Sequence, residues 1–136
     1  MIQHQTNIRV RYAETDQMGY VYYGNYLTYY EIGRVELIRE AGMTYKQLEE
    51  TGIMLPVLEA KCKYIRPAKY DDLLTLQTTI KEKPGVRIKF EYELWNEKKD
   101  LLNVGETTLV FISKSTLKPC DIPEEMKTIM FPSFEK

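Results

Sequence analysis

Residues 24–42 read G-N-Y-L-T-Y-Y-E-I-G-R-V-E-L-I-R-E-A-G, and this stretch decides the fold because it forms the one long helical pattern. Apolar residues recur near helical spacing on one face, which Arg34 interrupts, at Leu27, Tyr30, Ile38 and Ala41. We therefore predict a long helix over residues 24–41, with Gly42 as its stop. A glycine inside a helix costs about 1 kcal/mol relative to alanine. Gly33 thus indicates close packing of this helix against a sheet.

The segments after the helix are predicted from shorter patterns. Thr44 followed by Gln47 forms a capping box, so a short second helix is expected to begin there and to end at Gly52. Alternating apolar and polar residues predict four strands, at residues 58–64, 74–81, 86–94 and 103–113. Residues 83–85, Lys-Pro-Gly, make the turn that joins the middle two strands into a hairpin. Residues 122–124, Ile-Pro-Glu, start a short terminal helix.

Alternation within the strands predicts which side chains face the core. Ahead of the long helix, residues 7–12 form a half-buried strand whose apolar face is Ile8, Val10 and Tyr12. In residues 58–64 the apolar face is Leu58, Ala60, Cys62 and Tyr64. In residues 74–81 the inward side chains are Leu74, Leu76, Thr78 and Ile80. Three tyrosines on such faces are predicted to belong to the core rather than to a ligand cage: Tyr12, Tyr64 and Tyr92.

The last predicted strand, residues 103–113, is apolar on both faces. Leu109 and Phe111 point one way, and the opposite face carries Val104, Val110 and Ile112. A strand that is apolar on both sides, in a sheet that is otherwise apolar on one, predicts contact with another subunit or with a terminal segment.

The order of elements is strand, long helix, short helix and four strands, which is typical of the α+β class. Successive strands with short turns predict a five-stranded antiparallel sheet, and the long helix is the only element large enough to cover its apolar face. We predict that the helix lies in the concavity of this sheet. The length of 136 residues predicts a single domain, residues 1–136.

The overall composition excludes several classes of function. The 19 basic and 20 acidic residues give a formal net charge of -1, so nucleic acid is not an expected partner. No apolar run approaches the roughly 20 residues of a membrane span, and residues 1–11 carry no apolar stretch of signal-peptide length. We therefore expect a cytoplasmic protein. Cys62 and Cys120 lie outside any C-x-x-C pattern and are expected to be free thiols.

His4 is the only histidine, and it lies before the first predicted strand. Hydrolytic triads need a placed imidazole, and zinc sites usually use several histidine or cysteine ligands. We therefore expect no metal and no cofactor. Any catalysis must run on carboxylates, hydroxyls and backbone groups.

Residues 11–26 read R-Y-A-E-T-D-Q-M-G-Y-V-Y-Y-G-N-Y and place two carboxylates and a glycine just before the long helix. This segment resembles the signature of hot-dog-fold thioesterases of the 4-hydroxybenzoyl-CoA thioesterase class. It is also similar to the acyl-CoA thioesterases associated with the Tol-Pal operon. Residues 64–74, Y-I-R-P-A-K-Y-D-D-L-L, are similar to the Pro-Ala-x-Tyr-Asp-Asp segment of the same family. The resemblance implies a hot-dog fold, in which a curled antiparallel sheet wraps a long helix.

The resemblance further implies an acyl-CoA thioesterase whose catalytic aspartate is Asp16. A carboxylate can attack a thioester directly or deprotonate a water, and the sequence leaves both routes open. The amide that polarises the carbonyl is implied at Tyr23, at the helix N-terminus, where unpaired N–H groups carry about half a positive charge. Relatives of the Tol-Pal type often have histidine at this position and aspartate where Glu14 stands here. A histidine-dependent mechanism is therefore not expected.

Substrate contacts are implied around the same motif, at Gly19, Tyr22, Gly24, Asn25 and Tyr26. In the family, the coenzyme A groove lies between subunits and its phosphates meet basic side chains. The candidates for this role flank a turn and are Lys81, Lys83 and Arg87. The alternative is that these three side chains form an ordinary solvated turn. The resemblance also implies a homodimer or homotetramer with active sites at the subunit interface.

Two other functions remain open from the sequence. The thioester can be carried by an acyl carrier protein instead of coenzyme A, which changes the partner and not the chemistry. A non-catalytic acyl-CoA binding module is the second alternative, since a fold does not fix a function. A carboxylate at Asp16 favours an enzyme, because a negative charge beside an anionic ligand is costly unless it takes part in chemistry.

Overall fold

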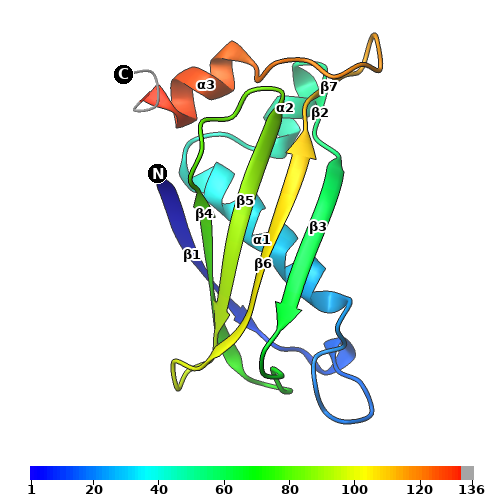
Figure 1. The fold of residues 1–136 in the computed structure, drawn as a ribbon, viewed down its shortest axis with the longest axis vertical. Helices are drawn as coiled ribbons and strands as arrows, with labels where there is room; N and C mark the ends of the chain where they lie inside the picture. The colour runs from blue at the N-terminus through cyan, green and yellow to red at the C-terminus, as the bar shows by residue number, and fades with distance from the viewer. Residues whose placement is uncertain (133–136) are drawn as a thin grey trace.

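The computed structural model describes residues 1–132. The largest element is a five-stranded antiparallel sheet with the strand order β1-β4-β5-β6-β3. The strands are β1 (Ile2–Arg9), β3 (Val57–Tyr64), β4 (Leu73–Ile80), β5 (Arg87–Trp95) and β6 (Leu101–Val110). The long helix α1 (Asn25–Glu40) lies across one face of the sheet, as Figure 1 shows. The predicted α+β class, antiparallel sheet and long helix are therefore confirmed.

Shorter elements lie at the two ends of the sheet (Figure 1). One end carries α2 (Tyr45–Glu50), the strand pair β2 (Ile53–Met54) and β7 (Ile112–Ser113), and α3 (Glu124–Met130). The other end carries the 3-10 turn η1 (Tyr12–Glu14) and the loop that leads into α1. The capping box predicted for α2 is present, because the side-chain oxygens of Thr44 and Gln47 each accept the other residue's backbone amide. Within residues 1–132, every helix is too short or too polar to span a bilayer.

The core lies between α1 and the sheet. The side chains predicted to point inward from β4 are all fully buried: Leu74, Leu76, Thr78 and Ile80. β5 pairs with β4 in antiparallel register, which confirms the hairpin. On β5 the pleat buries every second side chain, namely Ile88, Phe90, Tyr92 and Leu94. The two strands therefore present one apolar face to the helix.

Two glycines allow the helix to lie close to the sheet. A Cβ at Gly33 would lie 2.5 Å from a methyl group of Leu76, which confirms the predicted close packing. A Cβ at Gly105, on β6, would lie 2.5 Å from the Tyr30 ring and 2.6 Å from the Lys61 carbonyl. Non-bonded carbon atoms pack at about 3.5–4.0 Å. Only glycine therefore fits at these two positions without movement of the neighbours.

The space at Gly105 is filled by Tyr30 of α1. The Tyr30 ring stacks on the Tyr92 ring, with centroids 4.1 Å apart and an interplanar angle of 1°. The Tyr30 hydroxyl donates to the Oδ1 of Asn103 at 2.6 Å and lies 3.2 Å from the Sγ of Cys62. A buried tyrosine needs such a partner for its hydroxyl. Tyr30 thereby links α1 to three strands of the sheet.

The buried face of α1 differs in part from the prediction. Tyr30 and Ile38 are buried as expected, but Leu27 is 42% exposed, so its predicted burial is wrong. The buried side chains that the pattern missed are Tyr26, Tyr29 and Leu37. The two tyrosines can be buried because their hydroxyls find partners, the Ala68 amide for Tyr26 and the Glu14 carboxylate for Tyr29.

Arg34, which interrupts the apolar pattern of the helix, is only 7% exposed. Its Nε has no hydrogen-bond partner among residues 1–132. Burial acts to lower the pKa of the guanidinium, but Tyr92 and Tyr45 oppose this effect, and the pKa is raised overall. Arg34 therefore stays charged beneath the helix, beside two tyrosines.

The first strand lies nearer the N-terminus than predicted. β1 pairs with β4 from Ile2 to Arg9, so His4 lies inside the strand and not before it. Tyr12 falls in η1, and its side chain is 79% exposed, so the burial predicted for it is wrong. The ladder of backbone hydrogen bonds, which satisfies buried polar groups, sets the limits of this strand. Apolar alternation alone predicts a strand that begins and ends too far along the sequence.

β3 lies at an edge of the sheet, and this position changes the exposure of its side chains. Leu58 and Tyr64 were predicted to face the core, but they are 53% and 50% exposed, so this prediction is wrong for the single chain. Tyr92, on the central strand β5, is 1% exposed, as predicted. An edge strand has a neighbour on one side only and is covered less by the rest of the fold.

The C-terminal segment covers the end of β6. Leu109 and Phe111 are buried, and the opposite face is partly buried through Val104, Val110 and Ile112. The Cys120 amide donates to the carbonyl of Phe111 at 2.8 Å, and the Ile122 amide donates to the carbonyl of Gly85 at 2.9 Å. Of the two contacts predicted for this strand, the contact with a terminal segment is therefore observed. The terminal helix follows Pro123, as predicted.

We expect Gly105→Ala to lower the free energy of unfolding by about 1–3 kcal/mol, because the added methyl group overpacks the contact with Tyr30. Gly85→Ala is the matched control, since a Cβ there would meet nothing closer than 3.8 Å. Urea unfolding of both variants measures the difference. Equal stabilities would show that the helix can move away from Gly105 at no cost.

Candidate active site

Asp16 lies in a tight turn before α1. The Asp16 amide donates to the carbonyl of Tyr20 at 2.8 Å, and the Gly19 amide donates to the carbonyl of Asp16 at 3.0 Å. Gly19 has a φ of +76°, a left-handed conformation that glycine adopts without strain. Oδ1 of Asp16 accepts the amides of Met18 at 2.9 Å and Tyr20 at 3.3 Å. The turn therefore holds one carboxylate oxygen and leaves Oδ2 without a hydrogen bond from residues 1–132.

The N-terminus of α1 presents unpaired backbone donors beside this turn. Gly24 is the N-cap, and it has no side chain that can cap the helix. Neither the Tyr23 amide nor the Gly24 amide donates a hydrogen bond to any acceptor within residues 1–132. The first turn of a helix carries a partial positive charge. These two N–H groups are therefore free to bind a carbonyl oxygen or an anion.

The segment 65–72 holds the turn from the other side. Lys69 forms an antiparallel bridge with Tyr20, and the Val21 amide donates to the carbonyl of Ala68 at 2.8 Å. The Ala68 amide donates in turn to the Tyr26 hydroxyl of α1 at 3.1 Å. Two motifs separated by about forty positions in the sequence thus meet at one place in the fold.

A cleft of about 330 Å³ opens between these segments. Its walls are Asp16, Met18, Tyr20, Val21, Tyr23, Tyr26, Tyr64, Ile65, Arg66 and Pro67. The Tyr64 ring meets Tyr23 edge-on at 6.3 Å and Tyr26 at 5.6 Å between centroids. The Tyr64 hydroxyl lies 3.4 Å from the Tyr23 carbonyl. Asp16 and Tyr23, the residue that carries one of the two free amides, therefore line a largely aromatic cleft.

Residues 10–129 match the family model described as the thioesterase-like superfamily. The chain belongs to this superfamily.

Relatives of known sequence and structure agree with this assignment. The chain is 35% identical to a putative acyl-CoA thioesterase YneP of Bacillus subtilis over 82% of this chain and 81% of the relative. It is 30% identical to the acyl-CoA thioester hydrolase YbgC of Escherichia coli O6:H1, over 88% and 89% of the two chains. A DHNA-CoA thioesterase from Staphylococcus aureus superposes with a TM-score of 0.86 at 34% identity, covering 99% and 87%. The predicted hot-dog fold and the predicted thioesterase are confirmed.

In this thioesterase-like chain, the motif residues named from the sequence gather around one loop and one helix end. Asp16, Tyr23 and Tyr26 line the cleft. The neighbours that do not line it are Gly19, Tyr22, Gly24 and Asn25. The Tyr22 ring packs against the Tyr23 ring at 4.7 Å, outside the cleft. The fold thus brings the whole motif to one place but gives its members different positions.

The sequence reasoning missed several residues that form the cleft walls. Tyr64 was assigned to the core, and Met18, Tyr20, Ile65 and Arg66 were not considered as site residues. The family pattern Pro-Ala-x-Tyr-Asp-Asp falls on residues 67–72. The position of this motif shortly after Tyr64 was the signal that could have assigned Tyr64 to the site, because a family motif in a loop indicates a functional site.

Two of the tyrosine hydroxyls in the cleft, those of Tyr26 and Tyr64, have raised pKa values. Burial raises the pKa of Tyr26 despite the hydrogen bond from Ala68. Burial, followed by the neighbouring Cys62 thiol, raises the pKa of Tyr64 to about 12. Both hydroxyls therefore stay protonated at physiological pH, and they line the cleft without adding charge.

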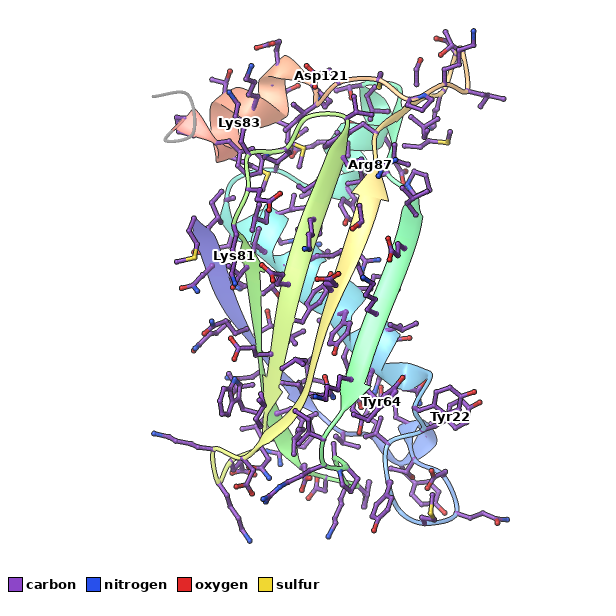
Figure 2. All side chains as sticks on the ribbon, viewed as in Figure 1. Tyr22, Tyr64, Lys81, Lys83, Arg87 and Asp121 are labelled. Atoms are coloured by element: carbon purple, nitrogen blue, oxygen red, sulfur yellow. The ribbon has the colours of Figure 1, made fainter. Side chains whose placement is uncertain are left out.

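The three basic candidates lie far from this cleft within one chain. Figure 2 shows Lys81, Lys83 and Arg87 toward one end of the molecule, while Tyr22 and Tyr64 lie at the other end. Of these three, Lys81 pairs with the Glu91 carboxylate at 3.4 Å. The single chain therefore does not bring the basic side chains to Asp16.

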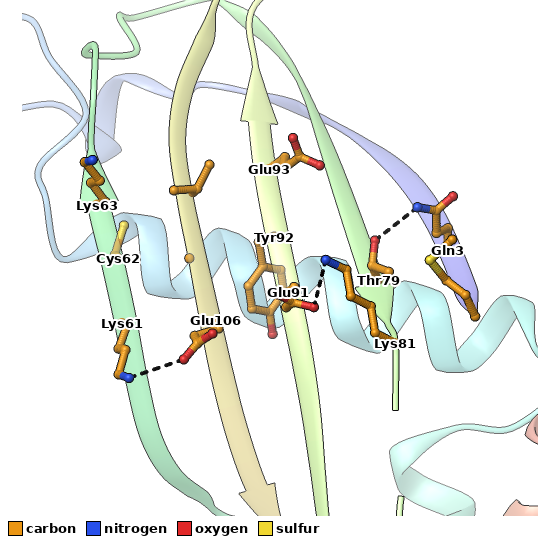
Figure 3. Close-up of a pocket in the computed structure, with 13 residues that line it drawn as sticks. Gln3, Lys61, Cys62, Lys63, Thr79, Lys81, Glu91, Tyr92, Glu93 and Glu106 are labelled. Carbon is orange, nitrogen blue, oxygen red and sulfur yellow. Dashed lines mark hydrogen bonds and ion pairs between the residues drawn. The ribbon is translucent and has the colours of Figure 1, made fainter. Parts of the chain in front are cut away.

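A larger hollow, of about 730 Å³, lies on the face of the sheet that points away from α1 (Figure 3). Several of its charged side chains are paired across the strands, as in the contact of 3.4 Å between Lys61 and Glu106. Neither Asp16 nor Tyr23 lines it. Within residues 1–132, no three His, Cys, Asp or Glu side chains lie close enough together to hold a metal ion.

We expect Tyr26→Phe to destabilise the protein by about 1–3 kcal/mol, because it leaves the buried Ala68 amide without its hydrogen-bond acceptor. Tyr12→Phe removes an exposed hydroxyl and serves as the control. The urea midpoints of the two variants give the comparison. A Tyr26→Phe midpoint equal to that of the control would mean that water replaces the hydroxyl.

Proposed function

We propose that this protein hydrolyses acyl-CoA thioesters to a free acid and coenzyme A. The observation that carries the proposal is that Asp16 and Tyr23 line the same cleft. A relative named an acyl-CoA thioester hydrolase, similar over most of both chains, supports this substrate class. The cytoplasm, where acyl-CoA is made and used, is the compartment that we propose.

In the proposed reaction, the free amide of Tyr23 binds the thioester oxygen. Negative charge develops on this oxygen as the carbonyl carbon becomes tetrahedral, and the partial charge of the helix N-terminus stabilises it. Loss of one such donor in other hydrolases costs about 3–4 kcal/mol of transition-state stabilisation. A backbone donor also has the advantage that its position is fixed by the helix.

Asp16 supplies the attack by one of two routes. As a nucleophile, Oδ2 adds to the carbonyl carbon, coenzyme A leaves as its thiolate, and water then hydrolyses the mixed anhydride. As a general base, the carboxylate takes a proton from a water that attacks the same carbon. Both routes give a free acid and the thiol of coenzyme A. In both, Oδ1 remains held by the turn amides.

The acyl group is proposed to occupy the aromatic cleft, between Tyr23, Tyr26 and Tyr64. The Tyr23 side chain adds to this wall while its amide serves the carbonyl. Gly19, Tyr22, Gly24 and Asn25 support the loop and the helix end that frame the substrate. The alternative carrier, an acyl carrier protein, would use the same cleft and the same chemistry.

We further propose that the active enzyme is a homodimer, or a pair of such dimers, that forms through β3. The edge of the sheet at β3 exposes unpaired backbone groups together with Val57, Leu58, Tyr64 and Ile65. Such an edge is a template for pairing with another strand. Antiparallel pairing of two β3 strands would bring the Lys83 and Arg87 end of one chain toward the Asp16 end of the other. Coenzyme A phosphates would then meet Lys81, Lys83 or Arg87 of the second subunit.

Asp16→Asn is expected to lower kcat by about 10²–10⁴-fold, because the amide can neither attack the thioester nor accept a proton from water. Release of free thiol from a panel of aliphatic and aromatic acyl-CoAs measures the effect. Glu97→Gln, an exposed change in the turn between β5 and β6, is the control and should retain wild-type turnover.

Three results would contradict parts of this proposal. Wild-type turnover by Asp16→Asn would remove Asp16 from the mechanism. Faster cleavage of a carrier-protein thioester would change the substrate carrier. Tight binding of coenzyme A with no turnover of any acyl thioester would make the chain a binding module.

Leu58→Asp is expected to produce a monomer with little activity, because it places a charge on the exposed apolar edge of β3. Leu117→Asp, at a position that is 71% exposed in a loop, should leave the assembly and the activity unchanged. Light scattering and thiol release are measured on the same samples. A Leu58→Asp variant with wild-type assembly would exclude β3 as the interface.

A further inference from the structure

The carboxylate of Glu14 is held between the chain that precedes it and helix α1. Oε1 accepts the backbone amide of Arg11 at 2.8 Å and the hydroxyl of Tyr29 at 2.9 Å. Oε2 accepts the Nε and the Nη2 of Arg11 at 3.2 Å and 2.9 Å. Only 12% of the Glu14 side chain is exposed, against 75% for Arg11. Each of the two carboxylate oxygens therefore accepts two hydrogen bonds.

The backbone of Glu14 makes a second connection to the entry of the helix. Its carbonyl accepts the Tyr22 amide at 2.9 Å and the Nδ2 of Asn25 at 2.8 Å. Tyr22 directly precedes the free amides of Tyr23 and Gly24, and Asn25 is the first residue of α1. Glu14 is thus joined through both its main chain and its side chain to the element that carries the proposed oxyanion donor.

Asp16 has no such connection of its own. Its hydrogen-bond partners are the amides of Met18, Gly19 and Tyr20 and the carbonyl of Tyr20, which all belong to the same turn. Thr15, between the two acids, bonds to the Tyr12 carbonyl and not to the helix. The junction at Glu14 therefore ties the Asp16 turn to α1 from one side, and Ala68, which bonds to Val21 and to Tyr26, ties it from the other.

Tyr29 makes this junction stiff. The residue lies in α1, is fully buried, and meets the Tyr26 ring edge-on at 6.0 Å. Burial acts to raise the pKa of Glu14, but the hydrogen bonds from Arg11 and Tyr29 outweigh this effect, and the pKa is lowered overall. Burial, then the bond to Glu14, raises the pKa of Tyr29. At neutral pH the pair is a carboxylate and a neutral hydroxyl donor, which is the strong form of this hydrogen bond.

Glu14 does not take part in the chemistry directly. It does not line the cleft, and its lone pairs are committed to Arg11 and Tyr29. We propose that Glu14 is a positioning residue, which acts through Arg11 and Tyr29 to hold the Asp16 turn against the free amides of α1. The inference rests on the proposed function of Asp16, and it assigns the first acid of the motif a role separate from the second.

The test compares Glu14→Gln, Tyr29→Phe and the double variant in thiol release from the best acyl-CoA substrate of the wild type. Each single change is expected to lower kcat by about 10–100-fold, because a small misplacement of reacting groups is costly. KM should stay within about threefold, since the cleft walls are unchanged. The double variant should be no worse than the worse single variant, because both changes weaken the same hydrogen bond between Glu14 and Tyr29.

Controls separate positioning from loss of fold. Glu97→Gln and Tyr12→Phe change exposed side chains of the same kinds and should keep wild-type kcat. Urea unfolding identifies any variant that is not folded at the assay temperature. If Glu14→Gln fails this check, the milder Tyr29→Phe decides the result alone. The pH at which kcat is half-maximal should be the same in all folded variants.

Four outcomes would overturn the inference. These are an unchanged kcat in Tyr29→Phe, a loss that appears only in KM, multiplicative effects in the double variant, and a shifted pH profile, which would make Glu14 a titrating participant. An inactive wild type would instead contradict the proposed function. The two failures are therefore distinguishable.

Discussion

The close approach of α1 to the sheet is the constraint on which the rest of the structure depends. Gly33 on the helix and Gly105 on β6 remove the two Cβ atoms that would otherwise hold the layers apart. The Tyr30 ring occupies the space so made and stacks on Tyr92, while its hydroxyl bonds to Asn103. A helix that is fixed this closely cannot slide along the sheet, because its buried ring would lose both the stack and the bond.

A fixed helix has a fixed N-terminus, and the candidate site is built around that end. Tyr26, in the first turn of α1, bonds to the Ala68 amide and so reaches the segment after β3. Tyr29, one turn further along, bonds to Glu14 in the segment before the helix. The same buried face that packs on the sheet therefore also holds the two loops of the site. The buried side chains that pack α1 on the sheet therefore also fix the geometry of the site.

The site also illustrates how charge is distributed in a chain with a net charge of -1. Glu14 is neutralised by Arg11, and several charged side chains on the outer sheet face are paired across strands, as Lys89 and Glu106 are at 3.2 Å. Asp16 has no cation within ion-pair distance among residues 1–132. Its carboxylate is instead held by backbone amides, which leaves one oxygen open to a substrate or a water.

The sequence by itself determined the elements and the motif. Periodicity gave the long helix, the capped second helix and the hairpin, because these depend on local spacing and local hydrogen bonds. The R-Y-A-E-T-D segment and the Pro-Ala-Lys-Tyr-Asp-Asp segment were enough to place the chain in a thioesterase family. The tertiary structure decided which side chains are buried. It put Leu27, Tyr12 and Tyr64 at the surface and Tyr26 and Tyr29 in the core. The physical reason is that burial depends on edge position, helix rotation and partners for hydroxyl groups, which are contacts between residues far apart in the chain. The cleft was likewise decided by the tertiary structure, because the segments that bound it are about forty positions apart in the sequence.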